Sequence, residues 1–158
     1  MKKQKGFSLI ELLIVVAIIL IIAAIAIPNL LRSRMAANEA SAVGSLRTIN
    51  TAEVTFATTY PTVGFASLTA LGGAAPCTSA LSTAACLLDD VLSGTTHTKS
   101  GYLFTVGSLT GTPVVTYTSL ATPTVVGQSG QRGFYSDQSG VIRYTTDGSQ
   151  PTNGSPAL

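Results

Sequence analysis

Residues 12–31 carry no charged side chain, and this uninterrupted run constrains the 158-residue chain more than any other feature. Built as an α-helix at about 1.5 Å per residue, the run is about 30 Å long, which matches the hydrocarbon core of a bilayer. A carboxylate, Glu11, stands directly before it, and such a group in lipid costs roughly 2–4 kcal/mol unless something neutralises it. The sequence therefore predicts a membrane-spanning helix whose edge carries an anion in need of a counterion.

The residues before Glu11 form a recognisable junction. Three lysines within residues 1–5 precede Gly6, which is followed by Phe7 and then by the apolar run. This order resembles the class III leader junction of type IV pilins and of the related pseudopilins, and the resemblance is close over about the first 60 residues. It implies that a prepilin peptidase cuts after Gly6 and methylates the new amino group of Phe7. It also implies that Glu11 pairs with the amino terminus of a neighbouring subunit during filament assembly.

Elementary electrostatics points to the same role for Glu11. Cleavage would leave a cationic amino group on Phe7, about one helical turn before Glu11, at the helix end where the dipole disfavours a cation. A carboxylate from an adjacent subunit would neutralise that cation and find its own counterion, and the pair would select one axial offset between helices. The alternative is that Glu11 lies hydrated at the headgroup boundary and does nothing in assembly.

Residues 7–60 are predicted to form one long helix, with a transmembrane or filament-core part at 7–31 and an amphipathic part at 32–60. Apolar residues recur in the second part at spacings near 3.5 to 4, apart from a step across Glu53. We expect this face to pack on a globular head and the charged residues to form the polar remainder. The apolar set is Ala42, Leu46, Ile49, Phe56 and Tyr60, and the charged set is Arg32, Arg34, Glu39, Arg47 and Glu53.

One proline lies within this expected helix and another directly follows it. Pro61 is expected to end it, because proline cannot continue a helix without losing a hydrogen bond. Pro28 stands inside the apolar run and frees the carbonyl of Ala24. We interpret Pro28 as a point where the helix bends or melts when subunits pack, as the resemblance implies; the alternative is a membrane proline that neighbouring groups tolerate.

The rest of the chain predicts a small sheet. Residues 61–100 are rich in small and hydroxyl side chains and are expected to form a connector with one or two turns of helix. Residues 101–158 are expected to form an antiparallel sheet of roughly four strands and a loose tail from residue 147. The expected fold is α+β, and this arrangement of a long helix and a small sheet resembles the type IV pilin fold. The first expected strand alternates, with Tyr102, Phe104 and Val106 on one face. The expected strands are 101–106, 114–119, 134–136 and 141–146, with a loop at 107–111.

Two cysteines, Cys77 and Cys86, fall within the connector. The leader lysines should hold the first residues in the cytoplasm and direct the remainder outward, where thiols oxidise. The expected disulfide is Cys77–Cys86, a staple across a short loop. A redox pair would normally be spaced C-x-x-C, and a metal site would need more ligands than the distant His97.

Charge and motif content exclude several function classes. Without residues 1–6, Lys99 and five arginines face seven acidic residues, a side-chain balance of −1, so no nucleic-acid surface is indicated. The sequence has no catalytic or phosphate-binding motif, so neither an enzyme nor a cofactor is expected. Asp137 and Asp147 lie in Gly- and Ser-rich segments that suit turns rather than a calcium loop, and no metal site is expected.

The expected function is therefore that of a type IVa-like major prepilin. The precursor would cross the bacterial inner membrane once, with its leader cytoplasmic and its head periplasmic, and then enter an extracellular filament. Its partners would be other copies of itself, the prepilin peptidase, the lipid bilayer before assembly, and an inner-membrane platform with a cytoplasmic ATPase. The expected role is attachment, twitching motility or DNA uptake. Two alternatives stay open: a major pseudopilin of type II secretion, and a periplasmic domain released by an ordinary signal peptidase at residues 24–26.

Overall fold

A single helix forms the first third of the protein. A computed structural model describes residues 7–73 and 76–158, and its first element, α1 (Leu9–Thr59), is a continuous helix of 51 residues that runs through Pro28. The long helix expected over residues 7–60 is therefore confirmed. Internal contacts divide the chain into two units, residues 1–34 and 35–158, and α1 contributes to both of them. Leader residues 1–6, including Gly6, lie outside the described residues.

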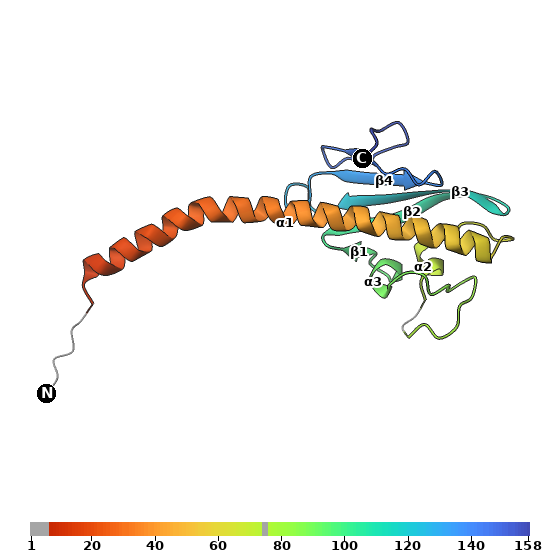
Figure 1. The fold of residues 1–158 in the computed structure, drawn as a ribbon, viewed down its shortest axis with the longest axis horizontal. Helices are drawn as coiled ribbons and strands as arrows, with labels where there is room; N and C mark the ends of the chain where they lie inside the picture. Colours follow the sequence, from red (N-terminus) through yellow and green to blue (C-terminus); the bar gives the residue numbers. More distant parts are fainter. Residues whose placement is uncertain (1–6, 74–75) are drawn as a thin grey trace. The chain divides into compact units, whose positions relative to one another are not determined.

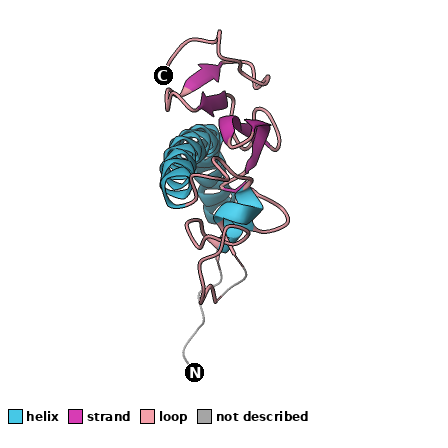
Figure 2. Cartoon of the chain, turned by 90° about the vertical axis from the view of Figure 1, so that its right-hand side faces the viewer, coloured by secondary structure: helices cyan, strands magenta, loops and turns pink. Residues whose placement is uncertain are grey.

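The second unit is a head in which the outer half of α1 packs along a five-stranded antiparallel sheet (Figures 1 and 2). The strands follow one another in sequence order, so each pairs with its chain neighbour and no strand crosses over another. This arrangement confirms the expected α+β fold. The strands are β1 (Thr98–Lys99), β2 (Tyr102–Gly111), β3 (Val114–Pro123), β4 (Gly133–Asp137) and β5 (Arg143–Thr145).

The core lies between the inner face of α1 and the sheet. Phe56 of α1, Tyr102 and Phe104 of β2, and Phe134 of β4 are fully buried. The predicted apolar residues of the helix lie in the same core. They can all face it because helical positions three and four apart fall on one side of the helix. Both sequence-derived faces are therefore confirmed: the helical one at Ala42, Leu46 and Ile49, which are fully buried, and the strand one at Tyr102 and Phe104.

The sheet differs from the expected one in strand count and length. The two residues of β1 pair with Tyr102 and Leu103, and so short a strand has no sequence pattern of its own. Residues 107–111, expected as a loop, belong to β2, whose register with β3 shifts between Gly107 and Thr110. At residues 107–111, cross-strand hydrogen bonds therefore outweigh the turn preference of the two glycines. The last strand, β5, is shorter than the strand predicted at residues 141–146.

The C-terminal tail, expected to be loose, is instead attached to the last strand. The amide of Tyr144 donates to the carbonyl of Pro156 at 3.0 Å, and the amide of Leu158 donates to the carbonyl of Ile142 at 2.8 Å. The guanidinium of Arg143 donates to the carbonyl of Ser155 at 2.9 Å. The tail thus covers the edge of β5, whose backbone groups would otherwise lack a protein partner.

Two single-turn helices interrupt the connector, as expected: α2 (Leu68–Leu71) and α3 (Asp90–Ser93). Each has a side-chain cap at its N-terminus. The amide of Ala70 donates to Ser67 Oγ, and the amide of Leu92 donates to Asp89 Oδ1. Since four residues alone cannot hold a helix in water, these caps and the burial of Leu71 and Leu92 stabilise the turns.

The predicted disulfide between Cys77 and Cys86 is present, with the two Cα atoms 5.8 Å apart. Backbone hydrogen bonds continue beside it. The amide of Ala85 donates to the carbonyl of Ala70 and the amide of Cys86 donates to the carbonyl of Gly72, each at 2.8 Å. The disulfide therefore closes a loop whose C-terminal part is also hydrogen-bonded to the end of α2.

Replacing both cysteines by serine is expected to lower the free energy of unfolding of the head by about 2–3 kcal/mol, because the unfolded chain loses a cross-link across a short loop. Denaturant unfolding of the detergent-solubilised protein measures this change. Wild-type protein treated with a reductant should match the double variant. Equal stability of the oxidised and substituted proteins would contradict a stapling role.

Candidate functional site

The start of α1 presents the carboxylate that the sequence singles out. Glu11 is exposed in the first helical turn, and its Oε2 accepts a hydrogen bond from the amide of Ser8 at 2.9 Å. Phe7, just before the helix, is 84% exposed. Within residues 7–73 and 76–158, Glu11 makes no ion pair with a basic side chain. The carboxylate therefore caps its own helix, and no cation from the described chain neutralises it.

The helix surface that follows Glu11 is apolar all round. Its most apolar window of 18 residues has a mean hydropathy of 3.3, and none of it is buried. By length and composition α1 is therefore able to cross a membrane. The large apolar side chains of residues 7–31 are between 46% and 84% exposed within the single chain. Such a surface can be covered by lipid or by the matching helices of other copies.

Two further carboxylates of α1 lie in the head, and the sequence analysis placed both wrongly. Glu39 and Glu53, assigned to the polar side of the helix, are 8% and 0% exposed. A signal for this placement was present in the chain. Positions 39, 42, 46, 49, 53, 56 and 60 recur at alternating steps of three and four, so both glutamates share the face of the buried apolar residues.

Glu39 has partners for both of its oxygens. Oε1 accepts from the amides of Gln131 and Arg132 at 2.9 and 3.1 Å, and Oε2 accepts from Arg132 Nε at 2.7 Å. Burial raises the pKa of this carboxyl, but the hydrogen bonds from these two residues and the charge of Arg132 outweigh burial and hold the pKa below its ordinary value. The guanidinium of Arg132 also lies over the rings of Phe134 and Tyr144. Glu39 thus fastens the loop before β4 to α1.

Glu53 has only one partner. Its Oε2 accepts from the amide of Ala66 at 2.9 Å, and its buried Oε1 has no hydrogen-bond partner within the described part of the chain. Burial raises the pKa of Glu53 to about 7, and the hydrogen bond from Ala66 opposes that rise only in part. This carboxyl is therefore the one acid in the core whose desolvation is not balanced.

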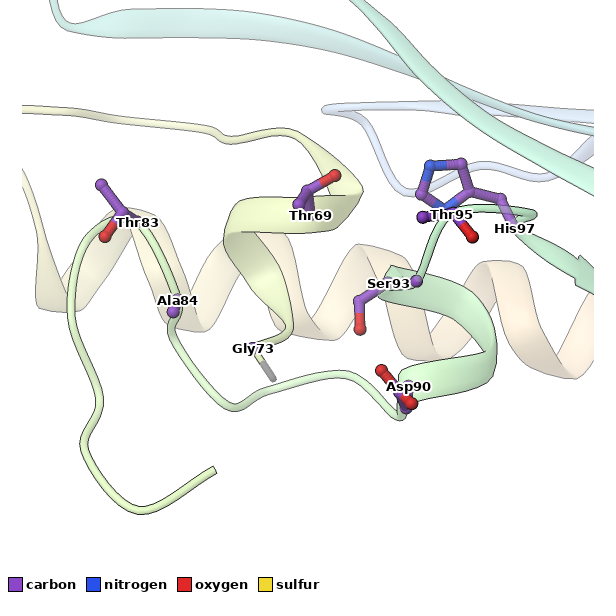
Figure 3. Close-up of a pocket in the computed structure, with 9 residues that line it drawn as sticks. Thr69, Gly73, Thr83, Ala84, Asp90, Ser93, Thr95 and His97 are labelled. Carbon is purple, nitrogen blue, oxygen red and sulfur yellow. The ribbon is translucent and has the colours of Figure 1, made fainter. Parts of the chain in front are cut away.

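The surroundings of His97 do not form a catalytic arrangement. His97, Ser93 and Asp90 line a pocket of about 330 Å³ beside α2 and α3 (Figure 3). His97 Nδ1 lies 2.7 Å from the carbonyl oxygen of Leu92, and Ser93 Oγ donates to the carbonyl of Asp89. The serine hydroxyl is therefore engaged with the backbone of its own turn rather than with the imidazole.

The two aspartates considered for calcium bond to local turns, as predicted from the sequence: Asp137 ends β4 directly before a turn, and Asp147 lies in a bend. Asp137 Oδ1 accepts from the amide and hydroxyl of Ser139, and Asp147 Oδ1 accepts likewise from Ser149. Each carboxylate thus bonds to the backbone two residues on. Among the residues that the structure describes, no three His, Cys, Asp or Glu side chains are grouped so that they could hold a metal.

Comparison with known proteins finds similarity over short stretches of the chain. Residues 1–27 match the family described as "Prokaryotic N-terminal methylation motif". The chain is 64% identical over 39 residues to "Type IV wide pilus major component PilA4" of Thermus thermophilus, covering 25% of this chain and 30% of that protein. It is 46% identical over 54 residues to "Type IV major pilin protein PilA" of Myxococcus xanthus, covering 34% of this chain and 24% of that protein. The matches thus span less than a third of either relative's length, and no solved structure matches.

Glu39→Gln is expected to lower the free energy of unfolding by about 1–2 kcal/mol near neutral pH, because it weakens charge-assisted hydrogen bonds to a partly solvent-screened Arg132. The pKa of Glu39 is lowered in the fold, so its stabilisation is present above the ordinary value of 4.5 and is lost as the pH falls below it. The gap between wild type and variant should therefore shrink in acid. Denaturant unfolding at neutral and acidic pH measures both effects.

Lys99→Gln provides the control, since it removes the exposed Lys99–Asp89 ion pair and should change stability by less than about 1 kcal/mol. A Glu39→Gln protein as stable as wild type at neutral pH would show that the loop before β4 does not depend on this carboxylate.

Proposed function

We propose that this chain is the structural subunit of a type IV pilus, processed after Gly6 and polymerised through α1. The proposal starts from the N-terminal methylation motif and the two pilin relatives, which support a type IV pilin and hence a structural protein rather than an enzyme. The fold, an apolar helix followed by an antiparallel sheet on its outer half, is consistent with that class.

The observation that carries the proposal is the unneutralised carboxylate of Glu11 at the start of an exposed apolar helix. Within the described chain this group has a backbone amide as partner but no cation. Cleavage before Phe7 would create a cation about one helical turn away, and in a staggered bundle the Glu11 of one copy meets the Phe7 amino group of another. The pair relieves the desolvation of the anion and the unfavourable position of the cation at the N-terminal end of a helix dipole.

The same logic gives an assembly sequence. The precursor inserts with residues 7–31 across the inner membrane, its lysine-rich leader in the cytoplasm and its head in the periplasm. After cleavage and N-methylation, the apolar helix exchanges lipid for the helices of other copies. Since lipid and protein are similarly apolar, this exchange yields little net hydrophobic free energy. Close packing and the Glu11–Phe7 pair would therefore set the register, and an assembly platform with a cytoplasmic ATPase would supply the work of extraction.

Pro28 supplies a site for local adjustment of the helix during assembly. In the single chain α1 passes through Pro28 without interruption. Proline nevertheless leaves the carbonyl of Ala24 without its usual amide donor, so opening the helix there breaks fewer hydrogen bonds than elsewhere. We therefore propose that the segment around Pro28 bends or melts as subunits pack in the filament.

The alternatives considered from the sequence have less support. Both matched relatives are named as pilus components, which favours a pilus over the pseudopilus of type II secretion. The methylation motif at residues 1–27 covers the small-residue stretch at 24–26, which favours a retained helix over a cleaved signal peptide. Attachment, twitching motility or DNA uptake would be lost when the filament is lost, and imaging cells with and without this gene tests that directly.

The mature protein should begin at Phe7 and carry a methyl group on its amino nitrogen. Mass spectrometry of protein released from cells measures both the first residue and the added mass. Gly6→Val should leave an uncut precursor in the membrane fraction, because a branched side chain replaces the hydrogen atom next to the scissile bond. A mature chain starting at Ile27 would instead identify an ordinary secretory signal.

Glu11→Ala and Glu11→Lys are expected to leave the protein in the membrane but to reduce filament yield by at least about tenfold, the factor that corresponds to about 1.4 kcal/mol of lost subunit contact. Electron microscopy of sheared filaments and immunoblots of membranes measure the two quantities. Glu11→Asp, which keeps the charge, is the matched control and should retain more assembly. Wild-type filament yield from the alanine and lysine variants would contradict the pairing.

A further inference from the structure

Glu53 occupies an unusual place in the core of the head. It lies near the end of α1 on the face that also carries Ile49 and Phe56, and all three side chains are fully buried. Its carboxyl has one hydrogen-bond donor, the amide of Ala66, and one buried oxygen without a partner among the described residues. A carboxylate so placed has lost its hydration without full replacement, and that loss is unfavourable.

The amide that Glu53 accepts from belongs to the segment that leaves α1, residues 60–67, which we call the exit segment. Local bonds hold this segment at two points. The amide of Gly64 donates to the carbonyl of Tyr60 at 3.0 Å, and Phe65 and Val63 exchange backbone hydrogen bonds with Val114 at the start of β3. Glu53 adds the one side-chain hydrogen bond between the interior of α1 and this segment. The closed position of the exit segment therefore includes contact with a titratable group.

No described group supplies Glu53 with a positive charge. From β3 the titratable group is Tyr117, whose hydroxyl donates to Asn50 Oδ1 at 3.1 Å. Burial, followed by the negative charges of Glu53 and Asp137, raises the pKa of Tyr117, so it stays neutral. Tyr60, the first residue of the exit segment, packs against the same core, and α2 carries no titratable side chain. The ion pairs of the described chain are Lys99–Asp89 and Arg132–Glu39, and neither involves Glu53.

We propose that Glu53 is a proton-dependent latch: its neutral carboxyl keeps the exit segment closed on α1, and its ionisation favours a form in which the segment opens and the carboxylate reaches water. The geometry supports this directly, because the exit segment brings the Ala66 amide onto the buried carboxyl. The segment is otherwise held by backbone hydrogen bonds in its middle and by the packing of the Phe65 ring on Tyr117. Opening it exposes Glu53 without dismantling the sheet or the Glu39–Arg132 contact.

The direction of the pH effect follows from the pKa of Glu53. In the closed form burial raises this pKa to about 7, while a solvated carboxyl keeps its ordinary value of 4.5. The closed form therefore binds the proton more tightly. The free-energy preference for the closed form is fully present below pH 4.5 and is lost as the pH rises through about 7. The latch is thus closed in mild acid and weakened at slightly alkaline pH.

Amide hydrogen exchange of the full-length protein in detergent micelles tests this proposal. After division by the intrinsic exchange rate at each pH, the protection of the Ala66 amide should fall on the order of 50-fold between about pH 5 and about pH 8, the range in which the closed and open forms bind different numbers of protons. Amides of β2 and β3 should keep their protection. Glu53→Gln removes the titration and should make the protection of Ala66 independent of pH in this range.

Glu39→Gln is the matched control, because it makes the same change on the same helix face at a carboxyl whose pKa is lowered rather than raised. This variant should retain the fall in Ala66 protection. Equal protection at both pH values in wild type, or an unchanged fall in Glu53→Gln, would overturn the latch. If Glu53→Gln does not fold, the titration of the wild-type Glu53 carboxyl by carbon NMR decides: a pKa near the ordinary 4.5 would overturn the proposal, and one near 7 would support it.

Discussion

The need of a desolvated carboxylate for a partner shapes this protein along the whole of α1. The helix carries three glutamates, and each satisfies that need differently. Glu39 accepts two backbone amides and the Arg132 guanidinium from the loop before β4. Glu53 accepts one amide, and burial raises its pKa to about 7. Glu11 caps its own first turn and has no cation in the described chain, so its counterion is proposed to come from a second copy.

The two parts of α1 meet different physical demands. The first part is apolar all round, which suits a helix that lipid or other helices cover on every side. The second part is apolar on one face only, where Leu46, Ile49 and Phe56 lie against the sheet. The first demand allows few residue types at any position, because every side of the helix must be apolar. A head needs only a core of suitable volume and pattern, which many sequences can supply.

The order of residues within short stretches of the sequence was enough to predict the features that depend on contacts between residues close in the chain. The long helix follows from apolar periodicity, the inward side of β2 follows from alternation at Tyr102 and Phe104, and the Cys77–Cys86 pairing follows from a count of two. The predicted exposure of Glu39 and Glu53 was wrong because it followed their charge rather than their spacing, although both fit the alternating steps of three and four. It missed β1 and the attachment of the tail because neither has a local pattern; each is defined by the strand beside it.

The sequence by itself determined the apolar helix, its length and the carboxylate at its edge, because these depend on residue type and order within a few turns. Only the tertiary structure decided which charges are buried and what they meet. The donors to Glu39 stand 92 and 93 positions away in the chain, and the amide bonded to Glu53 lies beyond the end of its helix. Such partners are set by the path of the chain through the fold, so a glutamate that looks polar in the sequence becomes a buried anchor or a proton-binding group.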